Sequence, residues 1–225
     1  MKQITVLLAE DHQIVREGLR SLLDHEQDIK VVGEAETGRQ AVQLTRKLRP
    51  TVVVMDIAMP LLNGLEATRQ IRKNFPATKV LILSAHSDDA YVEQVMTCGA
   101  AGFLLKQTSS SVLAKAIREV QKGNTFFNPS LSQRGKNAQS KPFNREGPLP
   151  KKGNCLSSRE VEVLQLIAEG KPNKQVSAEL GVSFKTVDKH RQHLMNKLNI
   201  HDIAGLTRYA IGQGIIESHV RIRIS

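Results

Sequence analysis

The sequence has little of what stabilises small secreted domains or holds a protein in a membrane. Its 225 residues include only two cysteines, Cys98 and Cys155, without CxxC spacing, so we expect neither a disulfide framework nor a zinc site. No apolar run approaches the roughly 20 residues that cross a bilayer, and no cleavage site follows the short apolar run near residue 1. These absences predict a cytoplasmic protein with no membrane partner.

Acidic residues are scarce in the second half of the chain. Residues 1–128 hold 16 lysines and arginines against 14 acids, whereas residues 129–225 hold 16 against 8. A basic C-terminal half indicates a polyanionic partner such as nucleic acid. A merely solvated basic face would give the same balance, so charge alone leaves both interpretations open.

The first 125 residues alternate short apolar runs with amphipathic stretches. The runs are rich in β-branched residues and nearly continuous, as in strands covered on both faces. They occupy residues 4–9, 30–34, 51–55, 79–83 and 102–105. Between them, apolar residues recur at helical spacing, as at Ile14, Leu19 and Leu22. The pattern predicts a doubly wound, flavodoxin-like α/β domain over residues 1–125, with a five-stranded parallel sheet.

The remaining chain is divided into a linker and a helical domain. Residues 126–154 are rich in Ser, Asn, Gly, Pro and Lys, which predicts a flexible basic linker. From residue 156 onward the apolar period is helical, and Ser157 with Glu160 has the spacing of a capping box. We therefore predict an all-α domain of four helices over 155–217, followed by a tail over 218–225.

Polar residues follow four of the predicted strands. Glu10 and Asp11 follow the first strand, Asp56 the third, Ser84 the fourth and Lys106 the fifth. Ligand sites in doubly wound sheets form at the carboxyl ends of the strands, so we expect these side chains to converge. Three adjacent carboxylates repel one another unless a cation such as Mg²⁺ joins them. One aspartate is then a nucleophile toward phosphorus, and the lysine holds a phosphoryl oxygen.

The motifs "LLAEDH", "VVVMDIAMP", "LILSAH" and "GAAGFLLK" resemble the receiver domain of two-component response regulators. The resemblance implies that Asp56 accepts a phosphoryl group from a sensor histidine kinase. It implies Mg²⁺ bound by Glu10, Asp11, Asp56 and the backbone carbonyl of Ala58. It assigns Ser84 and Phe103 as a switch pair and Lys106 as the phosphate contact. Gln107 stands where many receivers have proline, so we expect a trans peptide bond there.

Residues 173–198 have the helix, short turn and longer helix of a helix-turn-helix. An ordinary amphipathic helix with a solvated face would show the same pattern. However, "LSSREVEVL", "GKPNKQV", "TVDKHR" and "NKLNI" resemble the DNA-binding domain of LuxR/NarL-type regulators. The resemblance implies base contacts at Asp188, Lys189 and Gln192, and dimeric binding to paired half-sites. It also implies contacts to the DNA backbone at Lys174, Thr186 and Lys197. We add Lys185, which lies on the same polar stripe of the longer helix as Asp188, Lys189 and Gln192.

These motifs together predict a phosphorylation-controlled transcription factor that is not an enzyme. We expect it to bind promoter DNA as a homodimer when phosphorylated. A metal-dependent phosphohydrolase would carry a second aspartate two residues after Asp56, where this chain has Ala58. A regulator independent of phosphorylation usually lacks an acid or the lysine, and here all are present. No GxGxxG follows the first strand, which disfavours a dinucleotide-binding protein.

Overall fold

The computed structural model describes residues 3–85, 89–127 and 156–216. The chain forms two compact units, Met1–Gly147 and Pro148–Ser225, and each is considered by itself. Most of the predicted linker, residues 128–154, and the tail, residues 218–225, lie outside the described residues. Within the described residues, no helix is long and apolar enough to cross a membrane.

The first unit is built on a parallel sheet whose strand order is β2-β1-β3-β4-β5-β6. The strands are β1 (Ile4–Ala9), β2 (Ile29–Ala35), β3 (Val52–Asp56), β4 (Lys79–Ser84), β5 (Gly102–Leu105) and β6 (Phe126–Phe127). The five predicted strands are confirmed. The two-residue β6 was not predicted: it pairs with β5 through Gly102 and Phe103. The linker prediction was therefore wrong at residues 126 and 127, because the sequence around this short strand is polar and gives no alternation.

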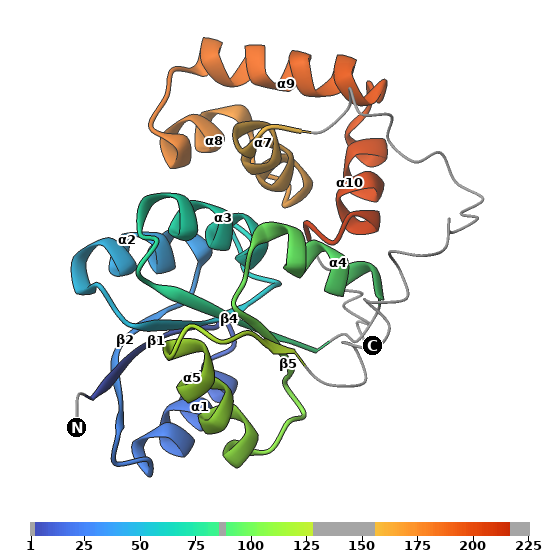
Figure 1. The fold of residues 1–225 in the computed structure, drawn as a ribbon. Helices are drawn as coiled ribbons and strands as arrows, with labels where there is room; N and C mark the ends of the chain where they lie inside the picture. The colour runs from blue at the N-terminus through green and yellow to red at the C-terminus, as the bar shows by residue number, and fades with distance from the viewer. Residues whose placement is uncertain (1–2, 86–88, 128–155, 217–225) are drawn as a thin grey trace, which may run out of the picture. The chain divides into compact units, whose positions relative to one another are not determined.

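Helices cover both faces of the sheet, as the continuous apolar strands require (Figure 1). α1 (Gln13–Asp24) and α5 (Ser110–Gln121) lie on one face, where Leu23, Leu113 and Ile117 enter the core. α2 (Gly38–Leu48), α3 (Gly64–Asn74) and α4 (Asp89–Cys98) lie on the other face. Ala41 and Ile71 are buried there, so each strand packs on helices from both sides.

The turn after β3 is held tightly against the strand. Asn63 caps α3 by accepting a hydrogen bond from the backbone N–H of Glu66 at 2.9 Å. The next residue, Gly64, donates its N–H to the carbonyl oxygen of Ile57 at 2.8 Å. A Cβ at Gly64 would lie 1.8 Å from the carbonyl oxygen of Asp56, so only glycine fits at this approach. The end of β3, and with it Asp56, is thereby fixed in place.

The described part of the second unit, residues 156–216, contains four helices, as predicted. They are α7 (Ser158–Ala168), α8 (Asn173–Leu180), α9 (Phe184–Leu198) and α10 (Ile203–Gly212). Ser157 and Glu160 form the predicted capping box at the start of α7. Between α8 and α9, Gly181 adopts a left-handed conformation (φ 62°) and Ser183 caps α9. Val187 and Leu194 are fully buried on the inner face of α9, which leaves its other face to solvent.

Candidate functional site

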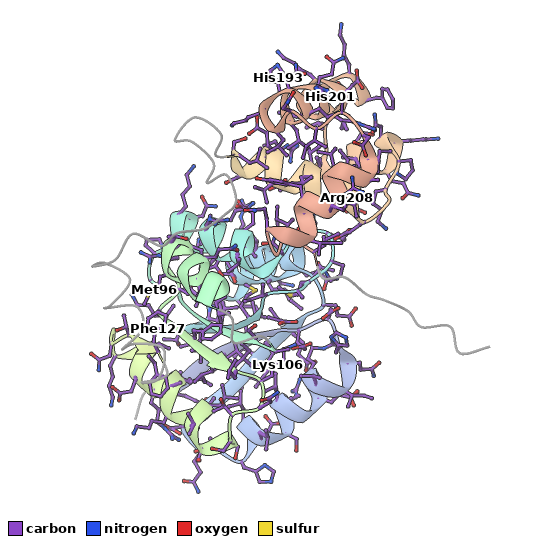
Figure 2. The ribbon with its side chains drawn as sticks, turned by 90° about the vertical axis from the view of Figure 1, so that its right-hand side faces the viewer. Met96, Lys106, Phe127, His193, His201 and Arg208 are labelled. Atoms are coloured by element: carbon purple, nitrogen blue, oxygen red, sulfur yellow. The ribbon has the colours of Figure 1, made fainter. Side chains whose placement is uncertain are left out.

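Three of the predicted strand-end residues form a charged cluster at the carboxyl edge of the sheet. Asp56, the last residue of β3, is only 4% exposed, and Glu10, directly after β1, is 1% exposed. Lys106, directly after β5, is labelled in Figure 2. Its Nζ lies 2.7 Å from Glu10 Oε2 and 2.9 Å from Asp56 Oδ2. The sheet topology thus brings together residues that are up to 96 positions apart, which the pattern of strand ends predicted.

The environment of Asp56 favours its neutral form. Burial, and then the nearby Glu10 carboxylate, raises the pKa of Asp56 to about 6. The Lys106 ammonium and a hydrogen bond from the N–H of Ile57 to Oδ1, at 2.8 Å, oppose this rise. The folded chain therefore holds negative charge here at a cost, and an added cation would relieve it.

Lys106 stays protonated although it is partly buried. Burial alone would lower the pKa of its ammonium, but the attraction of Asp56 and Glu10 outweighs burial and the pKa is raised. A persistent positive charge next to Asp56 suits the binding of an anionic group at that carboxylate.

Asp11 extends the cluster, and sequence analysis missed its neighbour His12. The ligand atoms of Glu10, Asp11, His12 and Asp56 all lie within 4.8 Å of one another. His12 Nδ1 is 2.9 Å from Asp11 Oδ1 and 3.2 Å from Glu10 Oε1. Asp11 is the main cause of the raised pKa of His12. The sequence "EDH" could have indicated this, because His12 directly follows the two acids Glu10 and Asp11.

The donor set fits a hard divalent cation. Glu10 Oε2 and Asp11 Oδ1 are buried and accept no hydrogen bond of ordinary geometry, although Lys106 and His12 are close to them. Three neighbouring carboxylates are costly to bury, and Lys106 supplies only one positive charge against them, so an added cation would be favourable. Oxygen ligands are those that Mg²⁺ prefers. Ala58, partly exposed in the turn after β3, is the fourth predicted ligand through its carbonyl.

Arg16 is a second residue that sequence analysis missed. This α1 side chain is 7% exposed and donates from Nη1 to the carbonyl oxygen of Glu10 at 2.7 Å. Its Nε and Nη2 donate to Glu34 at 3.2 Å and Glu36 at 2.8 Å. Arg16 therefore ties the loop that carries the acid pair to the end of β2. Arg16 stands at helical spacing from the buried Leu23 and the partly buried Leu19, but the sequence gave no sign of which acceptors its guanidinium would meet.

The two predicted switch residues lie on adjacent strands, Ser84 at the carboxyl edge and Phe103 two residues further into the sheet. Ser84 ends β4 and is 2% exposed, whereas Phe103 lies in β5 and is fully buried. Ile82 of β4 is the partner of Phe103 in the sheet register, and the N–H of Lys106 donates to the carbonyl oxygen of Ser84 at 2.8 Å. The described residues contain no cis peptide bond, so the expected trans bond before Gln107 is confirmed.

The polar stripe predicted on α9 is a solvent-exposed face. Its members are all exposed: Lys185, Asp188, Lys189, Gln192 and Asn196; His193 of α9 and Lys174 of α8 are exposed as well. Figure 2 labels His193 on this helix. Val187 and Leu194 anchor the opposite face, so these polar side chains remain available to a partner.

Two predicted phosphate contacts already have partners within the protein. Lys197 Nζ lies 3.0 Å from Glu160 Oε2, which links α9 to the capping box of α7. Burial alone would raise the pKa of Glu160. Hydrogen bonds from Ser157 and the positive charge of Lys197 outweigh burial, so the pKa is lowered. Thr186 Oγ1 lies 2.9 Å from Ser183 Oγ at the start of α9. Both side chains stabilise the unit in the described structure.

Comparison with known proteins identifies both units. Residues 6–118 match the family described as "Response regulator receiver domain", and residues 154–210 match "Bacterial regulatory proteins, luxR family". The transcriptional regulatory protein DegU of Brevibacillus brevis is 34% identical over 98% of this chain and 97% of its own length. The response regulator UvrY of Escherichia coli K12 is 37% identical over 94% of this chain and 95% of its own length.

Solved structures agree with these relatives. The crystal structure of the response regulator ChrA, from a haem-sensing two-component system, is 33% identical with a TM-score of 0.52 and covers 96% of this chain and 100% of its own. An RcsB response regulator from Salmonella typhimurium is 27% identical with a TM-score of 0.61, covering 95% and 99%. The chain belongs to the LuxR-family response regulators, transcription regulators that join a receiver domain to a LuxR-type DNA-binding domain.

Proposed function

We propose that Asp56 is the phosphoacceptor of this response regulator. A carboxylate oxygen of Asp56 attacks the phosphorus of a phosphohistidine on a sensor histidine kinase, and the bond from phosphorus to the imidazole nitrogen breaks. The phosphoryl group then resides on Asp56 as an acyl phosphate. The observation that carries this proposal is the burial of Asp56 at the end of β3 with Lys106 Nζ only 2.9 Å away. Lys106 is the contact that holds a phosphoryl oxygen.

We assign a Mg²⁺ site to Glu10, Asp11, Asp56 and the carbonyl of Ala58. Mg²⁺ would supply neutralisation of the charge that builds up on the phosphoryl oxygens. The close grouping of the three carboxylates, with Glu10 and Asp56 buried, supports the assignment. Arg16 holds the Glu10 carbonyl, which keeps the acid pair directed at Asp56. Ala58 carries no acid that could deliver a proton during turnover, so the site favours a lasting phosphoryl group over hydrolysis.

The signal passes from Asp56 through Ser84 and Phe103. Phosphorylation adds about −1.5 to −2 charge at the sheet edge. Ser84 hydrogen-bonds the phosphoryl group, and Phe103 repacks beneath β4 and β5. A switch from 1:99 to 99:1 needs about 5.5 kcal/mol of difference between the two states. The repacked surface then favours a homodimer or frees the second unit to bind promoter DNA in the cytoplasm.

The second unit binds double-stranded DNA through the exposed face of α9. Asp188, Lys189 and Gln192 contact base edges, where Lys and Gln donate and Asp accepts from a cytosine amino group. Lys174, Lys185, Thr186 and Lys197 contact the phosphate backbone, and Lys197 must leave Glu160 to do so. A structure of "two RcsB dimers bound to two parallel DNAs", 28% identical with a TM-score of 0.57, supports a dimeric mode.

Loading with beryllofluoride tests the phosphoacceptor. In the presence of Mg²⁺, ¹⁹F NMR of the full chain should show bound fluoride in wild type but none in Asp56→Asn. Asp24→Asn, at the exposed end of α1, is the matched control and should load as wild type does. Equal signals from wild type and Asp56→Asn would show that Asp56 is not the phosphoacceptor.

Selection of bound DNA from a random pool tests the proposed DNA binding by the second unit and its dependence on phosphorylation. Performed with and without beryllofluoride, it should enrich paired half-sites more strongly in the loaded protein. Light scattering on the same samples should show a heavier loaded species if activation works through dimerisation. Enrichment that does not depend on loading would show that this chain regulates independently of phosphorylation.

A further inference from the structure

We propose that His12 is an additional ligand of the cation site, which gives the resting receiver a preference for imidazole-binding divalent cations over Mg²⁺. The inference rests on the cation site of the proposed function and adds a nitrogen donor to its oxygen ligands. It concerns metal selectivity, because a nitrogen ligand strengthens the binding of Ni²⁺, Zn²⁺ and Cu²⁺ more than that of Mg²⁺.

The distances around His12 are those of neighbouring ligands on one ion. Nδ1 lies 2.9 Å from Asp11 Oδ1 and 3.2 Å from Glu10 Oε1. Adjacent ligands of an octahedral ion with bonds of about 2.1 Å are about 3.0 Å apart. Asp56 also offers an oxygen within the 4.8 Å span of the group. A single cation can therefore contact all four side chains with small adjustments.

The backbone holds the ring over the acid pair. His12 is the N-cap residue of α1, in an extended conformation, and its N–H lies 3.3 Å from Glu10 Oε1 as a donor. Arg16, one turn along the same helix, fixes the carbonyl oxygen of Glu10. These hydrogen bonds hold the His12 imidazole and the Glu10 carboxylate close to each other. The His12 side chain is 58% exposed, so an ion can enter from solvent.

The added nitrogen changes which cations bind well. Carboxylates, carbonyls and waters suit Mg²⁺, whereas imidazole suits Ni²⁺, Zn²⁺ and Cu²⁺. An imidazolium ion paired with Asp11 would bring the ring equally close without any metal role. The two arrangements differ in whether Nδ1 bonds to a metal ion, and that difference is measurable.

Metal titration of the full-length chain at one fixed pH separates these arrangements. Isothermal titration with Ni²⁺ and, separately, Mg²⁺ should show that His12→Phe weakens Ni²⁺ at least about tenfold, or about 1.4 kcal/mol. Mg²⁺ affinity should fall by a smaller factor. His25→Phe is the matched control, because α1 lies between the two histidines, and it should retain wild-type affinities. His12→Asn, which can place an amide oxygen near the position of Nδ1, should reduce the ratio of Ni²⁺ to Mg²⁺ affinity while it retains Mg²⁺ affinity.

Pulsed EPR of bound Mn²⁺ gives a second, direct measurement. A ¹⁴N coupling from coordinated imidazole should be present in wild type and His25→Phe, and absent in His12→Phe and His12→Asn. Unchanged Ni²⁺ affinity together with a coupling that survives in both His12 variants would overturn the proposal. Failure of wild type to load beryllofluoride with Mg²⁺ would instead overturn the phosphoacceptor role and leave the nitrogen coupling in place.

Discussion

The two sites of this chain place their charges in opposite surroundings. At the receiver edge, Glu10, Asp56 and Lys106 are held at strand ends and largely removed from water, so each charge depends on its neighbours. On α9, Asp188, Lys189 and Gln192 stand in solvent on a helix whose other face supplies the packing. In the buried cluster, a change of charge at one residue alters the free energy of its neighbours, whereas the exposed side chains of α9 keep their hydrogen-bonding groups accessible to a partner.

If this comparison is correct, substitutions at the receiver edge change the free energy of unfolding, whereas those at the exposed Asp188, Lys189 and Gln192 of α9 change DNA binding alone. Unfolding of the full chain by urea, followed by far-UV circular dichroism, measures the first quantity. Four variants test the contrast, and they are ordered from the largest expected effect on unfolding to the smallest.

Arg16→Leu should destabilise the receiver unit most, by about 2–3 kcal/mol, because it leaves the buried carbonyl oxygen of Glu10 without its donor and removes two ion pairs. Its three donor groups contact Glu10, Glu34 and Glu36. Arg20→Leu is the control: Arg20 also pairs with Glu34 but is 48% exposed, and its loss should cost less than about 1 kcal/mol. Equal losses from the two variants would show that burial does not set the importance of Arg16.

Asp56→Asn should stabilise the receiver unit in buffer without divalent cations, and increasingly so as the pH rises. The pKa of Asp56 is raised to about 6, above its value of about 3.9 in an unfolded chain. In the wild type, protonation of Asp56 therefore favours the folded state fully below about pH 4, and this contribution to the free energy of unfolding is lost as the pH rises through 6. Asparagine stays neutral, so the variant does not lose it. We expect a gain of about 1–2 kcal/mol at pH 7.5 that shrinks toward pH 5.

Urea titrations at several pH values check this prediction. Mg²⁺ should narrow the difference at pH 7.5, because it binds and stabilises the folded wild type more than the variant. A difference that stays constant between pH 5 and pH 7.5 would contradict the raised pKa.

Lys197→Gln should lower the stability of the second unit by about 0.5–1 kcal/mol, through loss of the ion pair with Glu160. The pKa of Glu160 is lowered, so this contribution is present above about pH 4.5 and fades as the pH falls further. The same substitution at the exposed Lys189, on the same helix, should leave unfolding unchanged. A cost that persists at pH 3 would mean that packing, not charge, explains the effect.

Lys189→Ala should change the unfolding free energy least, within about 0.5 kcal/mol, yet cost about 1–3 kcal/mol of discrimination between DNA sequences. Lys174→Ala should instead weaken binding to all sequences alike and reduce the salt slope by about one. Fluorescence anisotropy with the selected site and a scrambled duplex, at several salt concentrations, measures both. Unaltered discrimination with a reduced salt slope in Lys189→Ala would place Lys189 on phosphate.

The sequence predicted the sheet and most of the receiver cluster because strand ends of a parallel sheet meet at one edge. Asp56 and Lys106 could be placed together on that rule alone. His12 and Arg16 could not, since their roles depend on side-chain directions at the start of α1. Strand β6 was missed for a similar reason: two aromatic residues form a strand only because β5 offers an unpaired edge.

The sequence by itself determined the order of strands and helices, the acids and lysine at the strand ends, and the polar stripe along α9. These follow from local periodicity and from the fixed geometry of parallel sheets. Only the tertiary structure decided which of those charges are buried. Packing removed Asp56 from water and raised its pKa. It also paired Lys197 with Glu160 and placed Arg16 against the carbonyl oxygen of Glu10. The sequence could not show this, because the dielectric surroundings of a charge depend on neighbours that are distant in the chain.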